Sequence, residues 1–122
     1  MPTVVVDASA IAAILFGEPA GDEMQVAVRG QNLIAPRLLR FEIVNIALKK
    51  RRLQPASVDA IILALSSYTA LAIREVDIAM VDVFATAAQS GLSAYDASYL
   101  WLARREGTKL ITLDAELAAA SR

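Results

Sequence analysis

The chain has 122 residues, a formal net charge of −1 and a hydrophobic fraction of 57%. It contains neither histidine nor cysteine, which excludes thiol nucleophiles, Ser-His-Asp triads, disulfides and ordinary zinc sites. Any catalysis must therefore use carboxylates, hydroxyls, lysine, arginine, or hard metal ions held by oxygen. Because the charges nearly balance, a phosphate-binding role would need a local basic patch.

The large hydrophobic fraction must be placed in a core, a membrane or an interface. No apolar run reaches the roughly 18 residues that a membrane-spanning helix needs. The amino terminus lacks the basic segment of a signal peptide, because Asp7 is the first charged residue. We therefore expect a single domain over residues 1–122 in the cytoplasm, with no membrane association. The excess apolar surface is expected in a protein–protein interface.

Short apolar runs alternate with longer segments of helical periodicity. In chain order, the pattern predicts a strand at 3–6, helices at 9–16 and 20–29, a strand at 33–35, and helices at 38–53 and 56–69. It continues with a strand at 71–76, helices at 77–90 and 94–106, a strand at 109–112, and a last helix that starts at Asp114. Strands separated by helices indicate a parallel sheet covered on both faces. We expect a three-layer α/β/α domain with four to five strands.

Two aspartates follow the first and last predicted strands. Asp7 ends a run of three valines, and Asp114 comes just after the strand at 109–112. The carboxyl ends of parallel strands share one edge of the sheet, where ligands bind in such folds. The two carboxylates are therefore expected at the same edge. Their alternative roles are local: a helix N-cap for Asp114, and for Asp7 a turn beside an N-cap at Ser9.

Glu42 interrupts an apolar helix face. Its neighbours at helical spacing are Leu38, Leu39 and Ile46. A charge on an apolar face must be paired, protonated or bound to a cation, and Asn45, three residues on, could orient the carboxylate. The alternative is a glutamate at the edge of the face that extends into solvent.

Asp96 has a similar setting, with Leu92 and Leu100 one helical turn away on either side. Its alternative role is specific, because Ser93 and Asp96 have the spacing of a capping box at a helix start. Acids that gather at one sheet edge with oxygen ligands only are what Mg²⁺ or Mn²⁺ requires. Two such ions about 3.5–4 Å apart can activate water and stabilise the leaving oxygen of a phosphodiester.

Four segments carry a family resemblance: VVVDASAI, RFEIVNIAL, LSAYDASYLWLA and LITLDAEL. In this order and spacing they resemble the PIN domain and, within it, the VapC-type toxins of prokaryotic toxin–antitoxin pairs. The resemblance covers nearly the whole chain. It implies a Mg²⁺- or Mn²⁺-dependent endoribonuclease that forms a homodimer and is blocked by a cognate VapB antitoxin.

Carried over by position, the resemblance also assigns residues. The family's acidic quartet, which binds the metal and performs catalysis, falls on Asp7, Glu42, Asp96 and Asp114. Ser9 falls on the hydroxyl residue that supports the first acid, Thr112 on the polar residue before the last acid, and Asn45 on a polar companion of the glutamate. Many members continue beyond the position of Arg122 into a further short strand, so the number of strands stays open between four and five.

The alternative function is a catalytically silent PIN-like binding module that acts only through a protein partner. A haloacid dehalogenase type of enzyme would need a second aspartate where Ser9 stands, and a receiver domain would need a lysine where Thr112 stands. The apolar helices at 38–48 and 56–69 are candidates to bind a partner helix. The basic run at 49–52 is expected to be a solvated helix end.

Overall fold

The structure, a computed structural model that describes residues 1–122, is built on a four-stranded parallel sheet with the order β3-β2-β1-β4. Its strands are β1 (Thr3–Val6), β2 (Asn32–Pro36), β3 (Arg74–Val76) and β4 (Leu110–Ile111). The chain moves outward from β1 through β2 to β3 and then returns to place β4 on the other side of β1. Open parallel sheets bind ligands beyond the carboxyl ends of the strands where the order reverses in this way.

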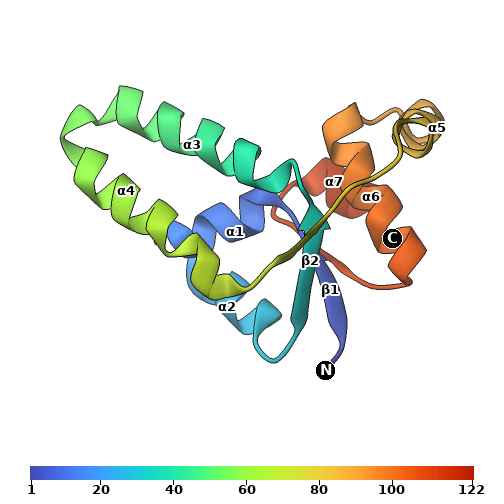
Figure 1. Ribbon diagram of the computed structural model, residues 1–122, viewed down its shortest axis with the longest axis horizontal. Helices are drawn as coiled ribbons and strands as arrows, with labels where there is room; N and C mark the ends of the chain where they lie inside the picture. The colour runs from blue at the N-terminus through green and yellow to red at the C-terminus, as the bar shows by residue number, and fades with distance from the viewer.

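Seven α-helices and two short 3₁₀ helices connect the strands. The α-helices are α1 (Ala8–Leu15), α2 (Gly21–Val28), α3 (Leu39–Leu53), α4 (Val58–Ser66), α5 (Met80–Ser90), α6 (Ala94–Glu106) and α7 (Ala115–Ala120). The first four lie on one side of the sheet and the last three on the other, and α3 and α4 form a hairpin that projects away from the strands (Figure 1). The predicted α/β/α architecture and parallel sheet are thus confirmed, with four strands.

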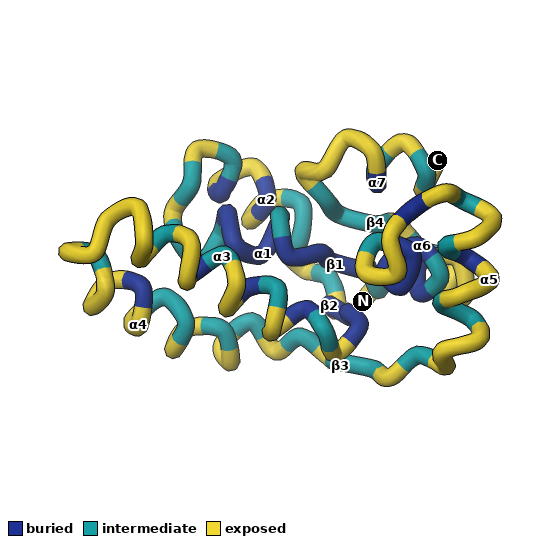
Figure 2. The backbone as a smooth tube through the Cα atoms, turned by 90° about the horizontal axis from the view of Figure 1, so that it is seen from above, coloured by how far each residue is buried: buried dark blue, intermediate teal, exposed yellow.

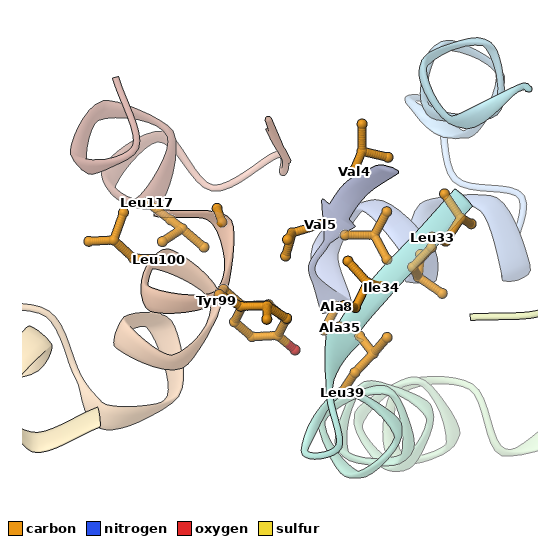
Figure 3. Close-up of a cluster of buried hydrophobic side chains, with 14 of the residues drawn as sticks. Val4, Val5, Ala8, Leu33, Ile34, Ala35, Leu39, Tyr99, Leu100 and Leu117 are labelled. Carbon is orange, nitrogen blue, oxygen red and sulfur yellow. The ribbon is translucent and has the colours of Figure 1, made fainter. Parts of the chain in front are cut away.

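The core lies along the central strand. Val5 and Val6 of β1 are fully buried, because helices cover both faces of the strand, and such strands are near-continuous apolar runs. The burial view shows the same pattern: β1, α1 and part of α6 are buried, whereas much of α4 and α5 is exposed (Figure 2). The close-up shows Tyr99 of α6 between that helix and strands β1 and β2 (Figure 3). The strand ends are therefore held in a rigid frame. None of the helices combines the length and apolar character needed to cross a membrane.

Several predicted boundaries were wrong, chiefly between α3 and α5. The strand predicted at 71–76 begins only at Arg74, because Tyr68–Leu71 form a 3₁₀ helix that ends at Ala72 with a positive φ of 52°. The helix predicted at 56–69 is split into a 3₁₀ turn at Pro55–Ser57 and the shorter α4. The helix predicted at 77–90 starts at Met80, after an extended Ala79. Short apolar runs do not distinguish these states by periodicity alone.

Candidate active site

Asp7 stands directly after β1 and is the N-cap of α1. Its Oδ1 accepts a hydrogen bond from the Ala10 N–H at 3.0 Å and from the Ser9 hydroxyl at 2.7 Å. Its Oδ2 accepts from the Thr112 hydroxyl at 2.5 Å. The residue is only 5% exposed, so the end of the strand places a buried carboxylate with both oxygens fixed. The N-cap is Asp7 itself, not Ser9 as the alternative for this turn supposed.

Two hydroxyls join Asp7 to the segment after β4. Ser9 Oγ donates to Asp7 and accepts the N–H of Leu113 at 2.9 Å. Thr112 Oγ1 likewise donates to Asp7 and accepts the N–H of Asp114 at 2.9 Å. Each hydroxyl thus uses its proton on the carboxylate and a lone pair on the backbone. These hydrogen bonds join the carboxyl ends of β1 and β4, with Asp7 on one segment and Asp114 on the other.

Asp114 is the N-cap of α7, as its local alternative predicted. Its Oδ1 accepts the Leu117 N–H at 2.9 Å. The other oxygen, Oδ2, accepts no hydrogen bond, and the residue is exposed. Capping therefore occupies one oxygen of Asp114 and leaves the second available to a ligand.

Asp96 lies in the first turn of α6. Ser93 Oγ accepts the Asp96 N–H at 3.2 Å, which is the first half of a capping box. The reciprocal bond from the Ser93 N–H to the Asp96 side chain is absent, and the carboxylate of Asp96 makes no hydrogen bond or ion pair in the chain. The capping alternative thus explains Ser93 but leaves the Asp96 carboxylate unpartnered.

Glu42 lies in the first turn of α3 and is partly buried. Its Oε1 accepts a hydrogen bond of 2.5 Å from the hydroxyl of Tyr99. Asn45, expected to orient this carboxylate, is exposed and makes no side-chain hydrogen bond. Tyr99 is buried in the core, and the sequence analysis did not identify its contact with Glu42. The available signal was chemical: the hydroxyl of a buried tyrosine usually finds a partner.

Three of the four carboxyl groups, those of Asp7, Glu42 and Asp96, have raised pKa values, first because they are buried and then because of neighbouring acidic charges. Burial raises the pKa of Asp7 above its ordinary value, against the hydrogen bonds from Thr112, Ala10 and Ser9, and the Asp114 charge raises it further. Burial likewise raises the pKa of Glu42, opposed by the Tyr99 hydrogen bond and reinforced by Asp96 and Asp7. For Asp96, burial raises the pKa first and the charges of Asp114 and Asp7 add to it.

No lysine or arginine forms an ion pair with any of these four acids. The nearest arginines along the chain are used elsewhere. Arg37 pairs with Asp77 at 2.9 Å, and Arg40 holds Glu75 through hydrogen bonds of 3.0–3.1 Å. The negative charge at the sheet edge is therefore left uncompensated by the protein, and it favours an external cation.

The donor set fits Mg²⁺ or Mn²⁺ by its chemistry, because it consists of carboxylate oxygens with hydroxyls behind them. The arrangement contains no group of three acidic side chains that could hold one ion between them. Mg²⁺ does not need such a group, since it keeps several waters and binds through one or two carboxylates plus substrate phosphates. The free oxygens on Asp96, Asp114 and Glu42 suit that mode of binding.

Comparisons with known proteins agree with this fold. The family model of the PIN domain matches residues 4–122. Ribonuclease VapC3 of Pyrobaculum aerophilum is 35% identical over 120 residues, which cover 94% of this chain and 92% of the relative. The crystal structure of PAE2754 from the same organism has a TM-score of 0.81 and 28% identity, and covers 99% of this chain and 86% of that one.

A more distant solved structure has the same fold. VapC20 of Mycobacterium tuberculosis, described as a toxin that cleaves the sarcin-ricin loop, has a TM-score of 0.70 at 16% identity. The match covers 97% of this chain and 95% of VapC20. At this identity the likeness concerns the arrangement of helices and strands alone.

Proposed function

The chain belongs to the PIN-domain family, and from this premise we propose that it is a metal-dependent endoribonuclease, the toxin of a VapBC-type pair. One observation carries the proposal: Asp7, Glu42, Asp96 and Asp114 come from separate segments, couple electrostatically and lack any cationic partner in the chain. The 35% identity to a protein named as a ribonuclease supports RNA as the substrate.

Each acid has a distinct part in the proposed mechanism. When bound, Mg²⁺ or Mn²⁺ supplies a Lewis acid that activates water and stabilises the leaving oxygen of a phosphodiester. Asp7, with both oxygens fixed by hydrogen bonds, keeps one carboxylate in an invariant position. Glu42, Asp96 and Asp114 each offer at least one oxygen without a partner. With no histidine in the chain, these carboxylates are the groups available to hold the metal and orient the water.

The proposed antitoxin would bind the hairpin of α3 and α4. A cavity of about 750 Å³ lies between the end of α1 and this hairpin, with Phe16, Leu53 and Ile61 among its lining residues. Leu53, which lines the cavity, is mostly exposed, and so are Ile62 and Leu63 of α4, which lie outside the cavity lining. Such a surface suits the apolar face of a partner helix, here a segment of a VapB-like antitoxin.

The proposed homodimer would use a different face. Met80, Val81 and Phe84 occupy neighbouring positions on α5, and Phe84 is 75% exposed. Exposed apolar clusters of this kind mark interaction surfaces. A toxin that acts on cellular RNA and pairs with an antitoxin is also expected in the cytoplasm.

The alternative, a catalytically silent binding module, shares the fold and the surfaces. It gives no reason to keep Asp7, Glu42 and Asp96 with raised pKa values, because such groups make the fold less stable at neutral pH. RNA cleavage distinguishes the two functions. The purified chain, freed of antitoxin, should cut RNA with Mg²⁺ or Mn²⁺ and stop in EDTA, and Asp7→Asn should abolish cleavage in a folded protein. Cleavage that survives chelation, or an Asp7→Asn variant as active as wild type, would refute the metal mechanism.

A further inference from the structure

Tyr99 carries a polar atom into the core that packing alone does not require. Its side chain belongs to the main hydrophobic cluster and is 1% exposed, so a phenylalanine would fill the same space. The hydroxyl points away from α6, toward the side of the sheet where β2 leads into α3 (Figure 3). There it donates to Glu42 Oε1.

We propose that Tyr99 is a positioning residue that holds Glu42 for metal binding; this rests on the proposed function, in which Glu42 is a metal ligand. A glutamate side chain has more rotational freedom than a tyrosine ring packed in a core, and fixing it costs conformational entropy. The hydrogen bond from Tyr99 restricts the Glu42 side chain before a metal ion binds, so less conformational entropy is lost on binding. The Tyr99 hydroxyl is the only hydrogen-bond partner of the Glu42 carboxylate, which forms no ion pair.

The contact leaves the chemistry of Glu42 intact. Tyr99 uses Oε1 and leaves Oε2 without a partner, so one oxygen is fixed and the other can bind. Hydrogen bonds that orient a ligand from behind are a general feature of metal sites, and their loss typically costs 10–100-fold in affinity or activity.

Tyr99 also sets the position of Glu42 relative to Asp96. Both Asp96 and Tyr99 lie on α6, three residues apart and on neighbouring positions of one helix face. The hydroxyl therefore fixes a carboxylate of α3 to the helix that carries Asp96, although the two acids repel each other. A single buried contact thus sets the spacing of two proposed ligands from different helices.

Tyr99→Phe tests the proposal, because it removes one oxygen atom and keeps the ring. Tyr68→Phe is the matched control: the Tyr68 hydroxyl also donates to a glutamate, Glu75, at 2.8 Å, outside the acid cluster. Mn²⁺ alone is the probe, and each variant's Mn²⁺ titration is read from its own melting temperature without RNA. Tyr99→Phe should weaken Mn²⁺ binding about tenfold or more, whereas Tyr68→Phe should bind as wild type does.

A double-mutant cycle with Glu42→Gln shows whether Tyr99 acts through the glutamate. In the Glu42→Gln background, Tyr99→Phe should cause no further loss of Mn²⁺ affinity. In RNA cleavage, Tyr99→Phe should lower kcat by about 10–100-fold with little change in KM. Full additivity in the cycle, or Mn²⁺ binding of Tyr99→Phe equal to that of Tyr68→Phe, would overturn the proposal.

A further test uses the wild-type chain, so its result does not depend on whether a variant folds. The Tyr99 hydroxyl proton should give a protected ¹H NMR resonance that shifts on saturation with Mg²⁺, because its acceptor becomes a ligand. A resonance unmoved by saturating Mg²⁺ counts against the proposal. A wild type that binds Mn²⁺ through the Tyr99–Glu42 pair but cuts no RNA would refute the proposed function and leave this inference standing. A wild type that binds no Mn²⁺ refutes both.

Discussion

Thr112 donates its hydroxyl proton to Asp7 across two neighbouring parallel strands, although the residues are 105 positions apart in the chain. The same hydroxyl accepts the backbone N–H of Asp114. Thr112 therefore determines two distances at once, that between the strand ends and that between the first and last acids of the cluster.

Thr112→Val should destabilise the protein, because it keeps the shape of the side chain and leaves a buried oxygen of Asp7 unpaired. Hydrogen bonds to charged groups are worth about 1.5–3 kcal/mol, and we expect a loss of unfolding free energy in that range by urea denaturation. Thr69→Val, at an exposed threonine with no side-chain hydrogen bond, should change stability by less than about 0.5 kcal/mol. Equal effects of the two substitutions would show that the Thr112 bond contributes nothing.

The parallel sheet and the approximate place of each acid could be predicted from the sequence. The three valines before Asp7 and the apolar run before Asp114 identify strands that end in carboxylates, and parallel strands bring such ends to one edge. The weaker predictions lie between α3 and α5. There the apolar residues at 68–73 suit a 3₁₀ helix or a strand equally well, and tertiary packing decides which forms.

The partner of Glu42 could not be predicted from spacing. Asn45 is a neighbour of Glu42 along one helix, and local reasoning finds such neighbours. Tyr99 is 57 positions away and reaches Glu42 only because α6 packs across the sheet from α3. Contacts of this kind depend on how helices pack around the sheet, and this packing cannot be predicted from one sequence.

The exposed apolar face of α5 leads to a prediction about the oligomeric state in solution. Phe84→Glu places a charge within the cluster of Met80, Val81 and Phe84, and a buried unpaired charge is costly. Light scattering at micromolar concentration should report a dimer for wild type and a monomer for Phe84→Glu. Val26→Glu, a change at a 63% exposed position on α2, is the control and should remain dimeric. A monomeric wild type would refute the dimer, and a dimeric Phe84→Glu would place its interface elsewhere.

Glu75, which lies outside the acid cluster, makes a pH-dependent contribution to the stability of the fold. Burial alone would raise the pKa of this carboxyl, but hydrogen bonds from Arg40 and Tyr68 outweigh it, and the pKa lies below the ordinary 4.5. An acid with a lowered native pKa stabilises the fold above its unfolded value, and the contribution is lost as pH falls through the native value. Glu75→Gln should therefore be about 1–3 kcal/mol less stable than wild type at pH 7.

The pH dependence of that difference is the check. Urea denaturation at pH 7 and at steps below 4.5 should show the two proteins converging as the wild-type carboxyl becomes protonated. A difference that stays constant down to pH 2 would mean that the ion pair with Arg40 is not its source.

A substitution at Asp96 distinguishes a metal site from a set of acids that only cap helices. Its native pKa is raised, by burial first and then by Asp114 and Asp7, so the native state binds protons more readily than the unfolded chain. For such a group stability falls as pH rises from its ordinary value of 3.8 through the native value. At neutral pH the charge of Asp96 therefore destabilises the metal-free fold. Asp96→Asn removes the charge and keeps the shape and the backbone N–H that Ser93 caps.

Asp96→Asn should melt above wild type in EDTA, by about 2–4 °C if the relief is roughly 0.5–1 kcal/mol. A cation that binds only the native state stabilises by mass action, so wild type should gain more from Mn²⁺ than the variant. Ser93→Ala separates capping from charge, because it removes the cap and leaves the carboxylate; it should melt lower in EDTA and keep the full Mn²⁺ gain. If Asp96→Asn melts lower in EDTA, or gains as much from Mn²⁺ as wild type does, Asp96 serves the helix and not a metal.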